Sequence, residues 1–377
     1  MQHVIISPNV NTGRYFPYLF TPNNYSHKLK AALGYYDTCS FDILGSPHEL
    51  QMLFSNILSR DVRRFAPDGN SLIFEGFVNR AVLTQPRARS EKSLENMYNR
   101  ISVRYTKLDT SSNPPGETEY TTTTKVNDTD SQGEYGIKEL VFRPPAEKLT
   151  QTSAEQIRDV ALEQYKVPRR SDTTMPGNDG YKLQVQCLGY IHTLKWRIYN
   201  QTVNSGTQNA STIIGSILDG IGDFIDTHRE DTNGTQTERY FNDDDTALSI
   251  IQKIASVGDN SNNRWIVYVD DNRHFVYEKA SSNVKYIRRL SDRKQAIRTL
   301  DGRTVPAWAI RPNTWMITTD AEMFSADNTD ITKNPRAMYI ESVEWLEDRN
   351  SLVIQGSIGD EIKTLMARVT AEGEAIL

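Results

Sequence analysis

The sequence lacks the features that mark membrane, secreted and disordered proteins. No stretch approaches the roughly 20 consecutive apolar residues that a bilayer-spanning helix needs. The first residues have neither a basic start nor a long apolar run, so we expect no secretory signal and folding in a cytoplasm. Apolar residues make up 37% and charged residues 24% of the chain. These proportions are ordinary for a soluble folded protein and exclude general disorder.

Cysteine is scarce, with Cys39 and Cys187 far apart in the sequence and each inside a strand-like run. A reducing cytoplasm disfavours disulfides, and an unpaired cysteine behaves as a small apolar residue. We therefore predict two buried free thiols.

Motifs for catalysis and for cofactors are also missing. The sequence contains no phosphate-binding loop, no His-Glu-x-x-His, no Gly-x-Ser-x-Gly and no Cys-x-x-Cys. Its six histidines include no pair at the spacing of helical metal ligands. We predict no enzyme and no cofactor, and we assign no catalytic, cofactor-binding or metal residues. The net charge of −5 gives no overall attraction for nucleic acid phosphates.

Three acidic segments need a choice between a binding role and a structural role. Asp243-Asp244-Asp245 offers ligands for a hard cation, but its position before Thr246 favours a role at a helix N-terminus. Segment 259–263 resembles the start of a calcium loop, which Arg264 excludes because that position needs glycine. A third cluster comprises Asp223, Asp226, His228, Glu230 and Asp231. It suggests a metal site or an acid/base pair, but we prefer to interpret it as solvated charges at a helix end.

One basic stretch could bind phosphates, but its surroundings are not basic. We interpret it as a solvated strand or as an interface with an acidic neighbour. It comprises Lys285, Tyr286, Ile287, Arg288 and Arg289, with Arg293, Lys294 and Arg298. The 18 tyrosines and 5 tryptophans are expected to supply protein contacts, where these residue types are enriched.

Short alternating segments and turn residues predict a chain rich in β-strands. Strands are expected at 35–44, 101–105, 181–190, 194–199 and 315–319. Hairpins are expected where turn residues separate two strands: 62–65 with 71–78, 265–269 with 274–278, and 338–345 with 351–357.

Three helices and two irregular segments complete the prediction. Ser153 and Gln156 resemble a capping box, and Ile157, Val160, Ala161 and Tyr165 share one face before Pro168. Helical spacing also predicts helices at 211–226 and from 245 or 246 to Gly258. Segment 108–132 has almost no apolar anchors and is expected to be an exposed loop or extended edge, and 168–180 a linker.

We predict an α+β fold, mainly β, with two β-rich ends and a helix-containing middle. The expected domains are 1–107, a first β domain; 108–180, an exposed loop, strand and helix insertion; 181–283, a strand pair, two helices and a hairpin; and 284–377, a C-terminal β-rich domain. No short-period repeat is evident.

The order of several segments resembles minor tail and baseplate hub proteins of long-tailed bacteriophages. The strand 74–78 is similar to the aromatic-x-Gly strand of tail-tube-like barrels, and 93–103 to the helix-to-strand passage that follows it. Further similar blocks are 135–139, the helix that ends at 165–168, Leu188-Gly189-Tyr190 with Leu194-Lys195-Trp196, and the Trp265 hairpin. Together they cover most of the chain from about 35 to 360.

The resemblance implies that the two end domains are tail-tube-like antiparallel β-barrels. It implies a trimeric hub in the virion tail tip, between the tail tube and distal tail protein on one side and a central spike or fibre on the other. Its lumen would pass tape-measure protein and then DNA, which suits an acidic chain.

Three alternatives stay open. A distal tail protein would form a sixfold ring. A carbohydrate-binding adhesin would stack sugars on exposed aromatics such as Trp308 or Trp315, and a hydrolase would use the acidic cluster that contains Asp226.

Overall fold

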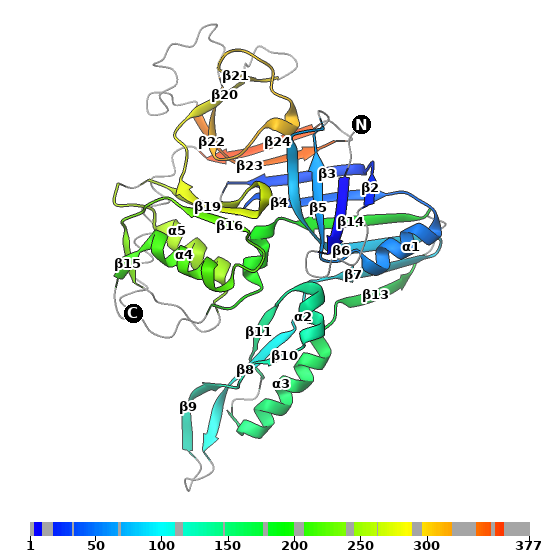
Figure 1. Ribbon diagram of the computed structural model, residues 1–377, viewed down its shortest axis with the longest axis vertical. Helices are drawn as coiled ribbons and strands as arrows, with labels where there is room; N and C mark the ends of the chain where they lie inside the picture. Colours follow the sequence, from blue (N-terminus) through cyan, green and yellow to red (C-terminus); the bar gives the residue numbers. More distant parts are fainter. Residues whose placement is uncertain are drawn as a thin grey trace.

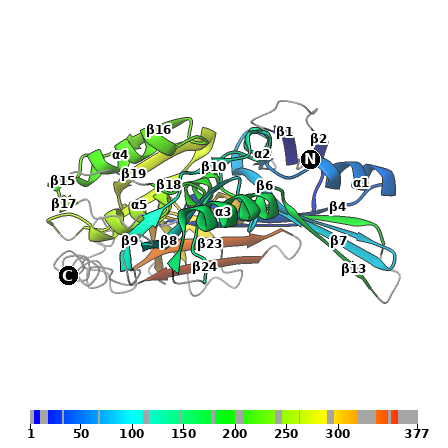
Figure 2. The ribbon, with the colours of Figure 1, turned by 90° about the horizontal axis from the view of Figure 1, so that it is seen from below.

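A computed structural model describes most of the chain as a large curled sheet, a helical unit beside it and a projecting lobe (Figures 1 and 2). The predicted α+β, mainly β fold is confirmed. The residues that the structure describes are 4–9, 18–31, 34–66, 69–109, 116–145, 148–175, 180–199, 207–238, 245–261, 263–288, 296–318, 337–347 and 351–357.

The first part of the large sheet comes from the first half of the chain. Its strands are β1 (Val4–Asn9), β2 (Tyr18–Phe20), β3 (Asn23–Lys30), β4 (Gly34–Ile43), β5 (Arg60–Phe65), β6 (Leu72–Gln85), β7 (Ala88–Ser93), β13 (Arg169–Thr174) and β14 (Lys182–Leu188). The predicted strand at 35–44 and the β5–β6 hairpin are both confirmed. Helix α1 (Pro47–Asn56) begins with a capping box between Ser46 and Glu49 and buries Leu50, Leu53 and Phe54.

The C-terminal strands continue the same sheet. They are β20 (Val284–Arg288), β21 (Ile297–Thr299), β22 (Thr314–Thr318), β23 (Ala337–Leu346) and β24 (Ser351–Ser357), and they bring the sheet to 14 strands. The first half of β23 pairs with β22, and its second half pairs with β3. The predicted β23–β24 hairpin is confirmed. Strand β23 therefore joins the two β-rich ends of the chain.

The sheet curls back toward itself. In sheet order, β5 and β23 are separated by four strands, β6, β14, β4 and β3. Nevertheless Arg64 of β5 binds both carboxylate oxygens of Glu347, directly after β23, at 3.0 and 3.1 Å. The Arg64 guanidinium also lies 4.6 Å from the ring centroid of Tyr25, and Arg64 and Tyr25 are each 1% exposed. A flat sheet could not bring these strands together.

The lobe is built around β8 (Arg100–Asp109). This strand pairs with β9 (Gly116–Thr122), β10 (Val126–Asn127), β11 (Glu139–Phe142) and β12 (Lys148–Leu149) in a five-stranded sheet. Helices α2 (Thr129–Tyr135) and α3 (Gln151–Tyr165) complete the lobe, which extends away from the main sheet in Figure 1. Helix α3 buries Ala154, Ala161 and Leu162.

The helical unit packs beside the large sheet and shares its core. Helices α4 (Ala210–Ile221) and α5 (Ala247–Val257) bury their apolar stripes, and α5 begins at the Thr246 cap and ends at Gly258 as predicted. Strand β16 (Thr227–Glu230) runs parallel to β19 (His274–Lys279), which forms the predicted hairpin with β18 (Trp265–Val269). Smaller elements are β15 (Thr207–Asn209), β17 (Gln236–Glu238), and the 3-10 turns η1 (Tyr190–Lys195), η2 (Asp271–Arg273) and η3 (Ala307–Ala309).

Several local predictions were wrong. Residues 194–199 do not form a strand, because Tyr190–Lys195 is a 3-10 turn with five consecutive buried residues, a pattern that periodicity cannot assign. Residues 169–174 form strand β13 rather than a linker. The cap of α3 is Thr150, whose hydroxyl accepts from the Ser153 amide, and not Ser153. Segment 108–132 contains β9, β10 and the start of α2, although its predicted extended-edge character holds for β9.

Candidate functional site

The residues of the predicted acidic cluster make separate polar contacts with different partners. The imidazole nitrogens of His228 lie 2.8 Å from Glu230 and 3.1 Å from Asp219. Asp223 pairs with Arg197, Asp226 lies 3.7 Å from Arg273, and Asp231 lies 3.5 Å from Arg229. Within the described ranges, no group of three or more His, Cys, Asp or Glu could hold a metal ion. Of these contacts, the one between His228 and Asp219 joins β16 to helix α4.

The other two acidic segments also have structural contacts. Asp245 lies 3.2 Å from Lys253, and the cap of α5 is the hydroxyl of Thr246, while Asp243 and Asp244 lie outside the described residues. The Asp259 carboxylate accepts from the amides of Ser261 and Asn263 and from the Trp265 indole. This loop is held by hydrogen bonds to its own backbone.

The basic stretch is only partly described. Lys285 and Arg288 lie on β20, and Arg298 lies on β21, where it donates to the carbonyl of Gly302 and to the Thr304 hydroxyl. Arg289, Arg293 and Lys294 lie outside the described residues.

The cysteines and tryptophans are used in the interior. Cys39 and Cys187 are free and buried as predicted, and they stand directly opposite each other on β4 and β14, which the sequence did not reveal. All five tryptophans are described, and none is exposed. Trp308 and Trp315 are half-buried, and the Trp315 indole donates to the Ser281 carbonyl at 2.8 Å. The adhesin alternative took both as exposed aromatics, and the structure gives both intermediate exposure.

A buried carboxylate fastens the lobe to the rest of the molecule. Glu139, at the start of β11, accepts from Arg100 at 2.9 Å, from Lys125 at 3.3 Å and from the Ile198 amide at 2.8 Å. The Glu139 side chain is 3% exposed, and its amide donates to the Trp196 carbonyl. Burial alone would raise the pKa of Glu139, but Arg100, the Ile198 amide and the nearby cations hold it below its usual value.

Beside Glu139, an aromatic stack and a buried lysine complete this junction. Trp196 packs edge-to-face on Phe77 of β6 and on Phe224, with ring centroids 5.1 and 5.4 Å apart. The Lys138 amine lies 4.9 Å from the Trp196 ring centroid and donates to the Leu94 carbonyl. Because it is 4% exposed, burial lowers the pKa of Lys138 to about 7. The lobe is therefore held by specific contacts with little water.

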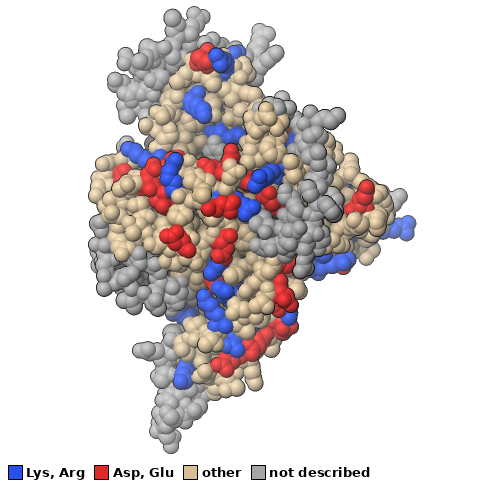
Figure 3. All heavy atoms as spheres, viewed as in Figure 1, with Lys and Arg blue, Asp and Glu red and all other residues tan. Residues whose placement is uncertain are grey.

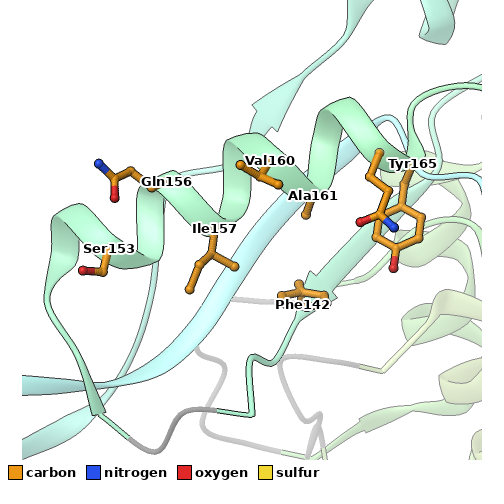
Figure 4. Close-up of a pocket in the computed structure, with 8 residues that line it drawn as sticks. Phe142, Ser153, Gln156, Ile157, Val160, Ala161 and Tyr165 are labelled. Carbon is orange, nitrogen blue, oxygen red and sulfur yellow. The ribbon is translucent and has the colours of Figure 1, made fainter.

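The lobe also carries an apolar groove along α3, shown in Figure 4. Its volume is about 340 Å³, and it is lined by Phe142, Ser153, Gln156, Ile157, Val160, Ala161, Gln164 and Tyr165. The sequence correctly placed Ile157, Val160, Ala161 and Tyr165 on one face, but this face lines an open groove. Val160 is 68% exposed. The sequence pattern identified the apolar face of the helix. It could not show that the lobe is too small to cover this face.

Many charged side chains of both signs lie on the surface of the molecule (Figure 3). Figure 3 shows both signs interspersed over the face of Figure 1, with a row of acidic side chains on the lobe. Asp159 and Glu163 of α3 have side chains that are 58% and 70% exposed. None of the helices in the described ranges combines the length and the apolar character that a membrane crossing requires.

Comparisons with known proteins gave structural similarities only. No family model and no curated protein matches the chain. The 43 kDa tail protein of prophage MuSo2 from Shewanella oneidensis is similar over 96% of this chain and 98% of its own, with 8% identity and a TM-score of 0.43. Prophage tail protein gp18 from Listeria monocytogenes EGD-e is similar over 99% of both chains, with 8% identity and a TM-score of 0.39.

A third similar structure is the tail protein from Neisseria meningitidis MC58, with 7% identity and a TM-score of 0.39 over 92% of this chain and 91% of that one. All three are tail proteins, the class that the order of sequence blocks resembles. Their TM-scores are too low to assign a function, so a functional proposal has to depend on the residues of this chain.

Proposed function

We propose that this chain is a structural subunit of a bacteriophage tail tip, in which it forms the hub. The observation that carries the proposal is the course of β23, which unites the two β-rich ends in one sheet. The Arg64–Glu347 contact then holds the curled part of this sheet, as a barrel-like unit requires. The sequence resemblance implies tube-like β units in a hub subunit, and the curled sheet, built from both ends of the chain, is the part of this molecule that would supply them.

The polar residues support a structural role. The best candidates for chemistry, around His228 and Asp259, are engaged in ion pairs and in hydrogen bonds that order loops and strand ends. The buried charges of Arg64 and Glu139 join segments far apart in the sequence. The contacts of these residues therefore stabilise the fold of the subunit.

The finer part of the proposal concerns the assembly. Three copies would form a ring whose two β units per subunit continue the sixfold tail tube. The partners would be the tail tube and distal tail proteins, the tape-measure protein and a central spike or fibre, with DNA only in transit. The protein would assemble in the host cytoplasm and reside in the virion tail tip. An acidic lumen would keep DNA from adhering, since like charges repel.

The experiment is electron microscopy of tails carrying a tagged chain, combined with mass measurement of the purified ring. We expect the tag at the tail tip and a threefold ring. A sixfold ring would support a distal tail protein instead. A strictly monomeric chain that is missing from the tail tip would overturn the proposal.

A further inference from the structure

The large sheet brings the two cysteines of the chain together. Only two cysteines occur in 377 residues, yet Cys39 of β4 stands directly opposite Cys187 of β14 in the antiparallel pair. The register of these two strands runs unbroken along their whole pairing. Strand β3 flanks β4 and β6 flanks β14, so the two cysteines lie inside the sheet and not at its edge. The sheet therefore fixes their separation.

This separation is the one that a disulfide needs. Opposed residues of an antiparallel pair have Cα atoms about 4.5 or 5.5 Å apart, and a disulfide usually joins Cα atoms about 4.4–6.8 Å apart. Opposed side chains also lie on the same face of the sheet. Burial, and then a hydrogen bond with the Cys39 thiol, raise the pKa of Cys187. The two thiols are therefore in contact in the core, and no strand has to move for them to join.

Two other roles for a buried cysteine pair fit these contacts less well. A structural zinc ion takes four ligands, and within the described ranges no group of three or more His, Cys, Asp or Glu could hold a metal ion. Cysteine can also fill a core as a small apolar residue, and Cys39 and Cys187 are 3% and 1% exposed. Such packing gives no reason for both opposed positions to carry sulfur.

We propose that Cys39 and Cys187 form a disulfide when the folded chain meets a peroxide, and that this bond joins β4 covalently to β14. In the first step one thiol takes an oxygen atom from hydrogen peroxide, which becomes water, and the sulfur is oxidised to a sulfenic acid. In the second step the other thiol displaces the sulfenic oxygen, which leaves as water with the thiol proton while the S–S bond forms. Two thiols and one peroxide thus give one disulfide and two waters.

The bond would close residues 40–186, which contain the whole lobe, into a covalent loop. A disulfide restricts the unfolded chain, and more so for a longer loop, so the oxidised form should resist unfolding. This inference goes beyond the proposed function and does not depend on it. Under the proposed function, the thiols would stay reduced during assembly in the host cytoplasm, and the bond would form after the particle leaves it.

The test treats the purified full chain with hydrogen peroxide, removes the peroxide with catalase, and alkylates free thiols with N-ethylmaleimide in denaturant. Both thiols should react before the treatment and neither after it, until a reductant restores them. Peptide mapping should then find the peptides of Cys39 and Cys187 joined within one chain. A wild-type chain that keeps both reactive thiols, or that joins to other copies through them, would overturn the inference.

The matched control combines Val185→Cys with Cys187→Val. Val185 is fully buried on the same face of β14, so the exchange keeps the composition and moves one thiol by two positions. Cys39 then faces its partner across a diagonal of about 7–8 Å, which a disulfide does not span without backbone movement. We expect this variant to form the bond at least about tenfold more slowly than the wild type. Circular dichroism checks its fold, and equal rates would overturn the inference.

A second measurement needs no variant. Urea unfolding compares the oxidised wild type with the same sample after reduction. At a fixed urea concentration, the equilibrium constant for unfolding should be at least about tenfold smaller for the oxidised chain. Equal unfolding of the two forms would contradict a bond that closes residues 40–186 into a loop.

Discussion

The main sheet and helix α3 of the lobe differ in where they place charged and apolar side chains. The sheet encloses charge, with Arg64 1% exposed against Glu347 and Tyr25, and it buries nearly all of its apolar side chains. The lobe keeps Asp159 and Glu163 in water and leaves Val160 and Val167 uncovered. A large curled sheet can surround its own interior, whereas one helix on a five-stranded sheet has a face left over.

This difference predicts which substitutions change the stability of the folded subunit. Substitutions in the sheet or at its junction with the lobe are expected to change the free energy of unfolding, because they remove buried partners. Substitutions at exposed positions of α3 are expected to leave the free energy of unfolding almost unaltered. Variants in the two regions test this expectation, beginning with the junction between the main sheet and the lobe.

The largest effect is expected for Glu139→Ala. The substitution leaves Arg100, Arg197 and the Ile198 amide without the buried carboxylate that they share. Breaking a buried ion pair from one side costs about 3–5 kcal/mol. Urea unfolding should show this loss in the free energy of unfolding.

The matched control is Glu163→Ala in the same lobe. The Glu163 carboxylate is 70% exposed and pairs with Lys166 at 2.9 Å, so a loss of less than about 1 kcal/mol is expected. Equal losses for the two variants would contradict the contrast between a buried junction and a solvated lobe surface.

Much of the local structure could be predicted because local chemistry specifies it. Turn residues placed the β5–β6 and β18–β19 hairpins, and the Thr246 cap and Gly258 stop placed α5. Strand β13 was missed because all six of its residues are exposed, so it carries no apolar alternation and is held by backbone pairing with β7.

What could not be predicted depends on distant partners. Strand β8 pairs with β9 to β12 in the lobe, a set of partners that its own sequence pattern does not indicate. The opposition of Cys39 and Cys187 depends on the register of β4 against β14, which are more than a hundred residues apart. The Glu139 junction and the exposed α3 face likewise arise from tertiary contacts. Periodicity reports which face is apolar but not what covers it.

An intermediate effect, visible as a pH dependence, is expected from Lys138. Its pKa in the folded state is about 7, below that of an unfolded lysine near 10.4, so the unfolded state binds more protons between these values. Stability from this group is therefore fully present above about pH 10.4 and is lost as pH falls toward 7.

The comparison variant is Lys138→Met, which keeps an apolar stem against Trp196 and removes the titration. From pH 7.5 to 9.5, the stability of the wild type relative to this variant should rise by up to about 1.4 kcal/mol per pH unit. A difference that stays constant with pH would show that the amine is not desolvated in the junction, and the lobe would then be less tightly attached than its contacts with Trp196 and Leu94 indicate.

The smallest effect on folding is expected for Val160→Ala in helix α3. At 68% exposure the valine side chain gains little burial from folding, and alanine has the higher helix propensity. The two terms oppose each other, so the free energy of unfolding of the monomer should change by less than about 0.5 kcal/mol. Ile340→Ala is the contrasting variant, because Ile340 of β23 is fully buried, and it should cost about 2–5 kcal/mol. Urea unfolding at low protein concentration separates this monomer term from association. A large loss for Val160→Ala under those conditions would mean that this side chain supports the lobe, which would contradict the contrast between the buried sheet and the exposed positions of α3.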